Sequence, residues 1–413
     1  MRRAGKSLPW EKSRIGFMRR CKSVCLPKQM LQIVKDVDCQ RARQRSSRSV
    51  DIREASFDDY PEICSLESQY GLESKEYGEW THLWTSNPAC GPNTPNWPIG
   101  WIAESRGQVV GYVGNIPLMY ELEGQPLIAA ATRAWVVDTQ YRNYSVPLLQ
   151  RYFTQQNVDI YLGTTANVQS SPVLGMFNSV PVPAGAWDQS AFWVTNSLGF
   201  ASSLIAMKGL PLRRHLSYAL SGALLVRKLF AGKGRDENCD EASVSCCEGF
   251  DERFDAFWQA SRREKSCLLL AVRTREVLDW HFKYAMLRDQ LWILTVMSGS
   301  KLVAYSIFCR QDSPKFGLKR MRLIDFQALD GKNALLVPML RSAIKRCHSE
   351  GIHMLEYIGM GQEVEDAISK LKPYRRKLPS WLYYYKAAND RLASRLADPM
   401  IWNPSGFDGD SSL

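Results

Sequence analysis

The sequence AWVVDTQYRNYSVP at residues 134–147 decides the interpretation of this chain. An apolar run ends at Asp138, a short polar loop follows, and apolar residues at helical spacing begin at Val146. A further apolar run, Asp159–Gly163, predicts a strand after that helix. Strand, loop, helix and strand in this order predict a crossover unit. Because N–H groups at the start of a helix are unpaired and carry partial positive charge, this loop is a general anion site.

Three apolar runs upstream of this unit predict an antiparallel meander. They span Gly100–Glu104, Gln108–Glu121 and Pro126–Val137. The short polar links Arg106-Gly107 and Glu123-Gly124-Gln125 suit tight hairpin turns.

The second half of the chain repeats this order of elements. A second meander, a helical run and a strand are predicted at Leu291–Val296, Lys301–Arg310, Lys319–Ala328, Ala334–Cys347 and Ile352–Ile358. A repeated unit predicts two copies of one fold. The fold class is therefore α+β, with two domains that each hold a mixed, mostly antiparallel twisted sheet with flanking helices.

The domain boundaries follow from shifts in composition and from the lengths expected of single domains. We predict a basic tail at 1–49, a first domain at 50–200, a connecting segment at 201–250, a second and more divergent domain at 251–390, and a C-terminal tail at 391–413.

The net charge of +11 comes from the first 50 residues, which carry 14 Lys and Arg against 3 Asp and Glu. The rest of the chain holds 39 basic and 39 acidic residues, and this neutrality argues against a nucleic-acid-binding body. Three alternatives account for the basic segment: a transit peptide, a disordered arm, or sequence translated upstream of a start at Met18 or Met30. No apolar run suits a membrane span, so we expect a cytoplasmic protein without a transmembrane segment. Scattered cysteines and histidines predict no metal site.

The stretch from Ala134 to Arg142 resembles the central strand and pyrophosphate loop of the GNAT superfamily of acyl-CoA N-acyltransferases. Arg142 matches the first position of the loop pattern, while Ser145 and Pro147 stand where that pattern has glycines. The run Thr164–Asn167 resembles the end of the family's fifth strand. The resemblance covers roughly residues 50–200.

This resemblance implies an acyl-CoA co-substrate, acetyl-CoA by default, and no metal. A strand N–H of Val136 or Val137 would polarise the thioester carbonyl, and Asn167 would help to hold the cofactor arm. The implied cofactor-binding residues are Val136, Val137, Arg142, Asn143, Tyr144, Ser145, Val146 and Asn167.

The acid and base of the reaction are harder to place. Leu174 occupies the position of the tyrosine that protonates the thiolate in many members of the superfamily, so no residue is assigned as the acid. Asp138, Glu104 and Asp188 are candidate bases from their proximity in the implied fold. Taken singly, a carboxylate of this kind is more often a surface or turn residue.

We therefore predict an enzyme that transfers an acyl group to an amine or hydroxyl of a small molecule or sugar. Asp330 in the second copy of the loop would repel a pyrophosphate, so one cofactor site is expected. Two alternatives remain open: a Fem-type transferase that uses aminoacyl-tRNA, and a non-catalytic protein on a decayed GNAT fold.

Two further features each allow two interpretations. The segment from Trp402 to Asp410 is either a flexible acidic tail or is anchored by its aromatic residues, in which case Asp408 or Asp410 could reach a cleft as a base or acceptor contact. Arg322 and Asp325 form either a buried ion pair or part of a cleft.

Overall fold

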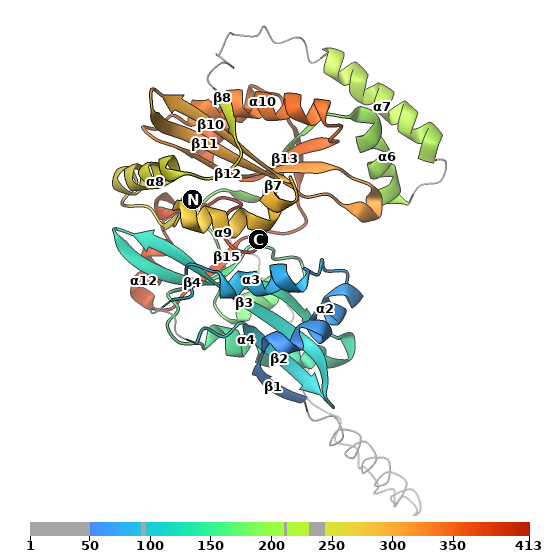
Figure 1. Cartoon of the computed structure of the whole chain (residues 1–413). Coiled ribbons are helices and arrows are strands. Elements are labelled where there is room, and N and C mark those ends of the chain that lie inside the picture. The colour runs from blue at the N-terminus through green and yellow to red at the C-terminus, as the bar shows by residue number, and fades with distance from the viewer. Residues whose placement is uncertain (1–49, 92–95, 210–212, 231–243) are drawn as a thin grey trace, which may run out of the picture. The chain divides into compact units, whose positions relative to one another are not determined.

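The computed structural model of the chain describes residues 50–91, 96–209, 213–230 and 244–413 (Figure 1). The predicted basic tail 1–49 and part of the predicted connecting segment lie outside these residues. The helices are α2 (Tyr60–Gln69), α3 (Tyr77–Thr85), α4 (Ser145–Phe153), α5 (Ser170–Met176), α6 (Ser197–Lys208), α7 (Arg213–Phe230), α8 (Glu252–Glu264), α9 (Arg275–Leu287), α10 (Leu336–Ser349), α11 (Gln362–Ser369) and α12 (Asp390–Leu396).

The first sheet has the strand order β1-β2-β3-β4-β5-β15-β6, with β9 paired to β3. Its strands are β1 (Val50–Glu54), β2 (Gly100–Ser105), β3 (Gln108–Leu122), β4 (Gln125–Val137), β5 (Ile160–Gly163), β6 (Val180–Pro181), β9 (Leu270–Ala271) and β15 (Tyr384–Ala387). The two predicted hairpin turns are confirmed. Arg106-Gly107 and Glu123-Gly124 all have positive φ, which is the backbone of a type I′ turn and matches the twist of paired strands.

The second sheet has the order β14-β7-β13-β12-β11-β10-β8. Its strands are β7 (Ala186–Val194), β8 (Val244–Cys247), β10 (Leu291–Ser298), β11 (Lys301–Arg310), β12 (Arg320–Ala328), β13 (Met354–Met360) and β14 (Tyr374–Lys377). In both sheets a meander leads through a helix into a parallel strand, β4 to β5 through α4 and β12 to β13 through α10. The predicted α+β class with two mixed sheets is confirmed.

The two sheets exchange strands. β7 follows the first crossover unit in the chain but pairs with β13 and β14 in the second sheet. In return, β15 follows the second unit but pairs with β5 in the first sheet. Strands therefore cross the predicted domain boundaries in both directions, a feature that neither strand's own sequence reveals.

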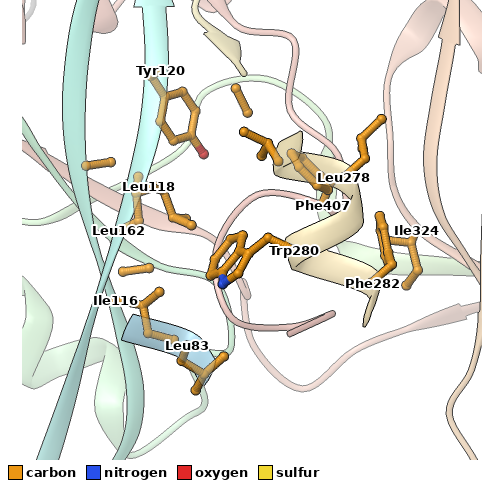
Figure 2. Packing of buried hydrophobic residues seen from close by; sticks show 14 of the residues in the cluster. Leu83, Ile116, Leu118, Tyr120, Leu162, Leu278, Trp280, Phe282, Ile324 and Phe407 are labelled. Atoms are coloured by element: carbon orange, nitrogen blue, oxygen red, sulfur yellow. The ribbon is translucent and has the colours of Figure 1, made fainter. Parts of the chain in front are cut away.

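One hydrophobic core joins the two sheets. It combines β3 residues such as Tyr120 with β11 residues such as Tyr305. Trp280 of α9 belongs to the same core and lies near Ile116 and Leu118 of β3 (Figure 2). The outer face of the first sheet is covered by α4, which buries Leu148 and Tyr152, and the outer face of the second is covered by α10 (Figure 1). Burying one large apolar side chain contributes about 1.5–3 kcal/mol, so this shared core binds the halves together.

The segment predicted as a C-terminal tail is part of this core. Trp402 and Phe407 are buried, and Phe407 packs beside α9 residues Leu278 and Phe282 (Figure 2). The segment is therefore anchored by its aromatic residues and is not a flexible acidic tail.

Candidate functional site

The first sheet opens along one edge of β4. Ala129, Ala130 and Ala131 pair with β5, and the ladder ends there. Beyond that point β3 still pairs with the other edge of β4 as far as Val137, but no described strand pairs with the edge that faced β5. Residues 132–137 thus present an unpaired strand edge, whose N–H and C=O groups are available to a ligand.

A β-bulge lies within this open stretch. The register of β4 against β3 skips between Arg133 and Val136, and Ala134 has a φ of 51°. A left-handed backbone costs about 1–2 kcal/mol for a residue with a Cβ. Opposite the bulge, a Cβ on Gly114 would lie 2.7 Å from the Tyr112 hydroxyl of its own strand and 3.0 Å from the Arg133 carbonyl oxygen of β4, so glycine suits this close packing. Bulges are concentrated next to active sites because they redirect the chain.

The predicted phosphate loop forms a 3₁₀ helix, Thr139–Tyr144, that leads into α4. The Asp138 carboxylate accepts a hydrogen bond from the Gln140 amide at 2.8 Å and so caps this turn. The Ser145 amide donates to the carbonyl of Arg142. The Ser145 bond occupies one of the loop amides that the sequence assigned to a phosphate. The Arg142 side chain, in the turn just before α4, is exposed.

The other implied cofactor-binding residues lie at the edges of this opening. Val136 is buried and pairs with Tyr112, and Val137 pairs with Gly111. The Asn167 side chain accepts hydrogen bonds of 2.9 Å from the amides of Gln169 and Ser170, which makes it a local cap at the start of α5. The roles of Arg142, Asn143, Tyr144, Ser145, Val146 and Asn167 towards a cofactor stay predictions.

The three candidate bases lie apart from one another. Glu104 on β2 forms an ion pair with Arg53 at 2.9 Å, and Asp188 on β7 lies 3.6 Å from Lys377 in the second sheet. Asp138 serves as the cap described above. Each of these carboxylates has a local structural partner, and their catalytic role stays a prediction.

A different carboxylate lies where β4 and β5 part. The hydroxyl of Thr164, at the end of β5, donates a hydrogen bond of 2.8 Å to Oδ1 of Asp410, and Thr165 donates a longer one of 3.4 Å. Asp410 is half-buried, and burial raises the pKa of its carboxyl above the ordinary value despite the Thr164 hydrogen bond, which lowers it. Thr132 on β4 donates to the carbonyl of Leu162 at 3.2 Å, so the hydroxyl groups of both strands line this end of the opening.

Gly409 brings Asp410 into this position. Its φ is 82°, and a Cβ there would lie 2.4 Å from the Thr164 side chain. The glycine is needed both for its conformation and for its close approach. The Gly-Asp pattern near the end of the chain was the sequence signal for this site, but its contact with β5 spans more than 200 positions and leaves no local pattern.

The residues before Asp410 are fixed by a buried polar network. Asp408 accepts a hydrogen bond from the Tyr120 hydroxyl at 2.9 Å, and burial raises its pKa to about 6. Arg273 donates to both oxygens of Asp325, at 2.8 and 3.1 Å, and to the Ser405 hydroxyl at 3.1 Å. Asp325 therefore pairs with Arg273 and not with Arg322, which corrects the ion pair considered from the sequence.

His281 closes the network on the side of α9. Its Nε2 lies 2.8 Å from the Ser412 hydroxyl, and its ring lies 4.4 Å from the ring of Phe407. Burial lowers the pKa of His281 to about 3, so the imidazole is neutral at physiological pH.

Two cavities lie away from the opening. One of about 20 Å³, the size of a single water, is lined by Leu118, Tyr120, His281 and Phe407 among others. A second of about 310 Å³ lies beside the end of α4, with Trp97, Trp101 and Arg151 in its wall. None of the predicted site residues lines either cavity.

Within the described residues, no three His, Cys, Asp or Glu side chains are grouped to hold a metal ion. None of the described helices is both long and apolar enough to cross a membrane.

The arrangement of sheets matches solved acyltransferase structures. N-myristoyltransferase from Saccharomyces cerevisiae with bound myristoyl-CoA and inhibitors aligns with a TM-score of 0.51 and 12% identity, over 82% of this chain and 81% of that chain. A second structure of that enzyme, with bound myristoyl-CoA, gives a TM-score of 0.50 and 11% identity, over 82% and 79%. This chain shares the N-myristoyltransferase fold. The predicted α+β fold with two mixed sheets is thereby confirmed.

Other comparisons add little to the N-myristoyltransferase match. A GCN5-related N-acetyltransferase from Anabaena variabilis aligns with a TM-score of 0.45 and 12% identity, over 83% of this chain and 73% of that chain. No family model and no curated protein matches the sequence. At these identities, the likeness to N-myristoyltransferase establishes the fold alone.

Proposed function

We propose that this chain is an acyltransferase that moves an acyl group from coenzyme A to an amine or hydroxyl of a small molecule or sugar. The observation that carries this proposal is the open edge of β4, with its bulge at Ala134 and the Asp410 carboxylate at its end. The N-myristoyltransferase fold supports it, because that enzyme was solved with bound myristoyl-CoA.

The open strand edge suits the acyl donor. The thioester of an acyl-CoA supplies an activated carbonyl and a thiolate leaving group. N–H groups on the unpaired stretch 132–137 would hydrogen-bond the carbonyl oxygen and stabilise the negative charge that develops there. Arg142, exposed where α4 begins, would pair with a phosphate of the coenzyme.

Asp410 is suited to the proton transfer. An attacking amine or hydroxyl must lose a proton, and a carboxylate within hydrogen-bond reach can accept it. Burial raises the pKa of Asp410, which makes its carboxylate a stronger base than an exposed one. The Thr164 hydroxyl orients it and leaves Oδ2 without a hydrogen-bond donor from a described side chain.

The first test is binding of the donor by the full-length protein. Thermal unfolding would be followed during titration with acetyl-CoA, myristoyl-CoA, free CoA and dephospho-CoA. A ligand that binds only the native state raises stability by about 2.7 kcal/mol at a hundredfold excess over its Kd. The absence of any shift at millimolar ligand would reject the proposal.

The second test is the phosphate contact. Arg142→Ala should weaken acyl-CoA binding about tenfold, since one charge-assisted hydrogen bond is lost. Arg391→Ala, at an exposed position on α12, is the matched control and should leave the affinity unchanged. An unchanged affinity in Arg142→Ala would place the coenzyme elsewhere.

A further inference from the structure

Three arginines surround one buried glutamate on the second sheet. Glu356 of β13 has no exposed side-chain surface, and its Oε2 lies 3.0 Å from Arg322 and 3.3 Å from Arg320, both on β12. Arg376 of β14 contacts Oε1, which also accepts a hydrogen bond of 2.6 Å from Ser190. The register places Arg322 beside Glu356 on the parallel pair β12 and β13, so the sheet itself brings these charges together.

The cluster carries more positive charge than its own carboxylate neutralises. Asp312, the other carboxylate that acts on Arg320, forms an ion pair of 2.6 Å with Arg310. Glu356 therefore faces three guanidinium groups, which leaves an excess of two positive charges. Like charges gathered at one site repel one another, and a further anion would offset that repulsion.

The electrostatics of the group reflect this excess. Burial acts to raise the pKa of Glu356, but attraction to Arg322, Arg376 and Arg320 outweighs it and lowers the pKa to about 2. Burial, together with repulsion from Arg322, lowers the pKa of Arg320 to about 10. The Nε atom of Arg322 is buried and has no hydrogen-bond partner in the described part of the chain. A further anion would relieve the repulsion among the three guanidinium groups.

Solvent reaches the arginines although it does not reach the glutamate. The side chains of Arg320 and Arg322 are about one-fifth exposed, at 19% and 21%, and that of Arg376 is 44% exposed. A ligand can thus contact the exposed parts of guanidinium groups whose position is fixed by the buried Glu356 carboxylate.

The cluster is joined to the Asp410 site by hydrogen bonds. Arg322 donates a hydrogen bond of 2.6 Å to the side-chain oxygen of Gln311. The side-chain NH₂ group of Gln311 in turn donates one of 2.9 Å to the carbonyl of Ser411. Ser411 directly follows Asp410. A single side chain, that of Gln311, therefore links Arg322 to the residue that follows the proposed base.

We propose that Arg320, Arg322 and Arg376 bind a phosphate or carboxylate group carried by the acyl acceptor. The acceptor is then an amine or alcohol with an anionic group. The assignment of the anion to an acyl acceptor rests on the proposed acyltransferase function. The anion site itself rests on the arginine cluster alone. Guanidinium groups suit this role because they present paired donors to the oxygens of phosphate and carboxylate.

Binding of inorganic phosphate to the full-length protein tests the anion site directly. Isothermal titration at low ionic strength should show saturable binding to the wild type and at least a tenfold weaker Kd for Arg376→Gln. Arg346→Gln is the matched control, because the Arg346 side chain on α10 is about as exposed as that of Arg376 and also pairs with a glutamate, Glu350. Wild-type protein that binds no phosphate, or equal binding by Arg376→Gln, would overturn the proposal.

A second variant separates loss of the site from loss of the fold. Arg376→Lys keeps the charge next to Glu356, so it should fold like the wild type and bind phosphate within about threefold of the wild-type Kd. Circular dichroism and the midpoint of thermal unfolding check the fold of each variant. Phosphate binding that follows the unfolding midpoint instead of the charge at position 376 would show a structural effect and reject the site.

Two matched pairs of compounds identify the source of the anion. Phosphoethanolamine should compete with phosphate and ethanolamine should not, and glycine should compete better than glycinamide. If Arg376→Gln instead removes a preference for CoA over dephospho-CoA, the cluster holds the coenzyme's 3′-phosphate and the acceptor assignment is wrong. Failure of acyl-CoA binding with intact phosphate binding would reject the proposed function and leave the anion site standing.

Discussion

The Thr164 hydroxyl donates a hydrogen bond of 2.8 Å to the Asp410 carboxylate, and so joins residues 246 positions apart at the point where β4 and β5 separate. β5 is only four residues long, and Thr164 directly follows its last residue. The bond therefore fixes a carboxylate beside the open strand edge through the geometry of the sheet, without a dedicated loop.

Asp410→Asn should reduce turnover while leaving donor binding intact. The asparagine keeps the size and can still accept the Thr164 hydrogen bond, but it cannot accept a proton, so the rate should fall by about 10²–10⁴-fold. Release of the CoA thiol from acetyl-CoA, with and without added amines, measures this rate. Asp390→Asn, at an exposed position of α12, is the control, and a turnover equal to wild type in Asp410→Asn would remove Asp410 from the mechanism.

Gly409→Ala should displace Asp410 from Thr164. A Cβ at this position would meet the Thr164 side chain at 2.4 Å and would also force alanine into a left-handed conformation. We expect a loss of about 2 kcal/mol in the free energy of unfolding, since strain and overpacking add. Gly331→Ala also places alanine at positive φ but in open space, and therefore isolates the steric part. Equal unfolding midpoints for the two variants would contradict the close contact.

Ala134 should respond to substitution in two opposite ways. Ala134→Gly relieves the left-handed strain and should stabilise the protein by up to about 1 kcal/mol, because the gain is reduced by the greater freedom of glycine in the unfolded chain. Ala134→Val adds a β-branched side chain at positive φ and should destabilise it by more than that. Chemical denaturation measures both, and a valine variant as stable as wild type would show that the bulge is absent in solution.

Two buried groups, His281 and Asp408, should contribute to the pH dependence of stability in opposite directions between about pH 6.5 and 5. His281 has a native pKa of about 3, below its unfolded value, so its contribution is present above pH 6.5 and is lost as the pH falls. Asp408 has a native pKa of about 6, above its unfolded value, so its contribution is present below about pH 4 and is lost as the pH rises through 6.

Single variants should reveal each contribution. Between pH 6.5 and 5 the change in the free energy of unfolding should be more negative than in the wild type by about 1 kcal/mol in Asp408→Asn, and more positive than in the wild type by about 1–2 kcal/mol in His281→Leu. Urea denaturation at the two pH values measures these slopes, which are compared within each variant so that its overall loss of stability does not matter. Parallel slopes in the two variants would show that these groups are not the source.

The sequence predicted the elements of this fold better than their assembly. Alternating apolar runs and the Arg106-Gly107 turn identified the meander, because strand period and turn chemistry are local properties. The membership of β7 in the second sheet was not predicted, because the sequence of a strand does not determine which sheet it joins. The loop containing Arg142 was correctly placed before a helix, but its conversion to a 3₁₀ turn depends on the Asp138 cap and was not foreseen.

The candidate site was predicted less well for the same physical reason. Glu104 and Asp188 were chosen by their proximity in the fold that the resemblance implies, whereas the structure gives them ion-pair partners from other strands. Asp410 was considered as a base or acceptor contact only in one of two interpretations of the C-terminal segment, because its burial depends on Phe407 packing against α9 and on Thr164. The arginine cluster at Glu356 draws on β12, β13 and β14, and only the sheet register brings those strands together.

The reciprocal placement of β7 and β15 has a consequence for how the protein unfolds. Melting either sheet withdraws a strand from the other, so neither half has an independent folding transition. Calorimetry of the full chain should therefore give one peak whose calorimetric and van't Hoff enthalpies agree. For the same reason, duplication of an ancestral unit can be retained in such a protein only as an inseparable pair, because loss of one copy would remove a strand from the other.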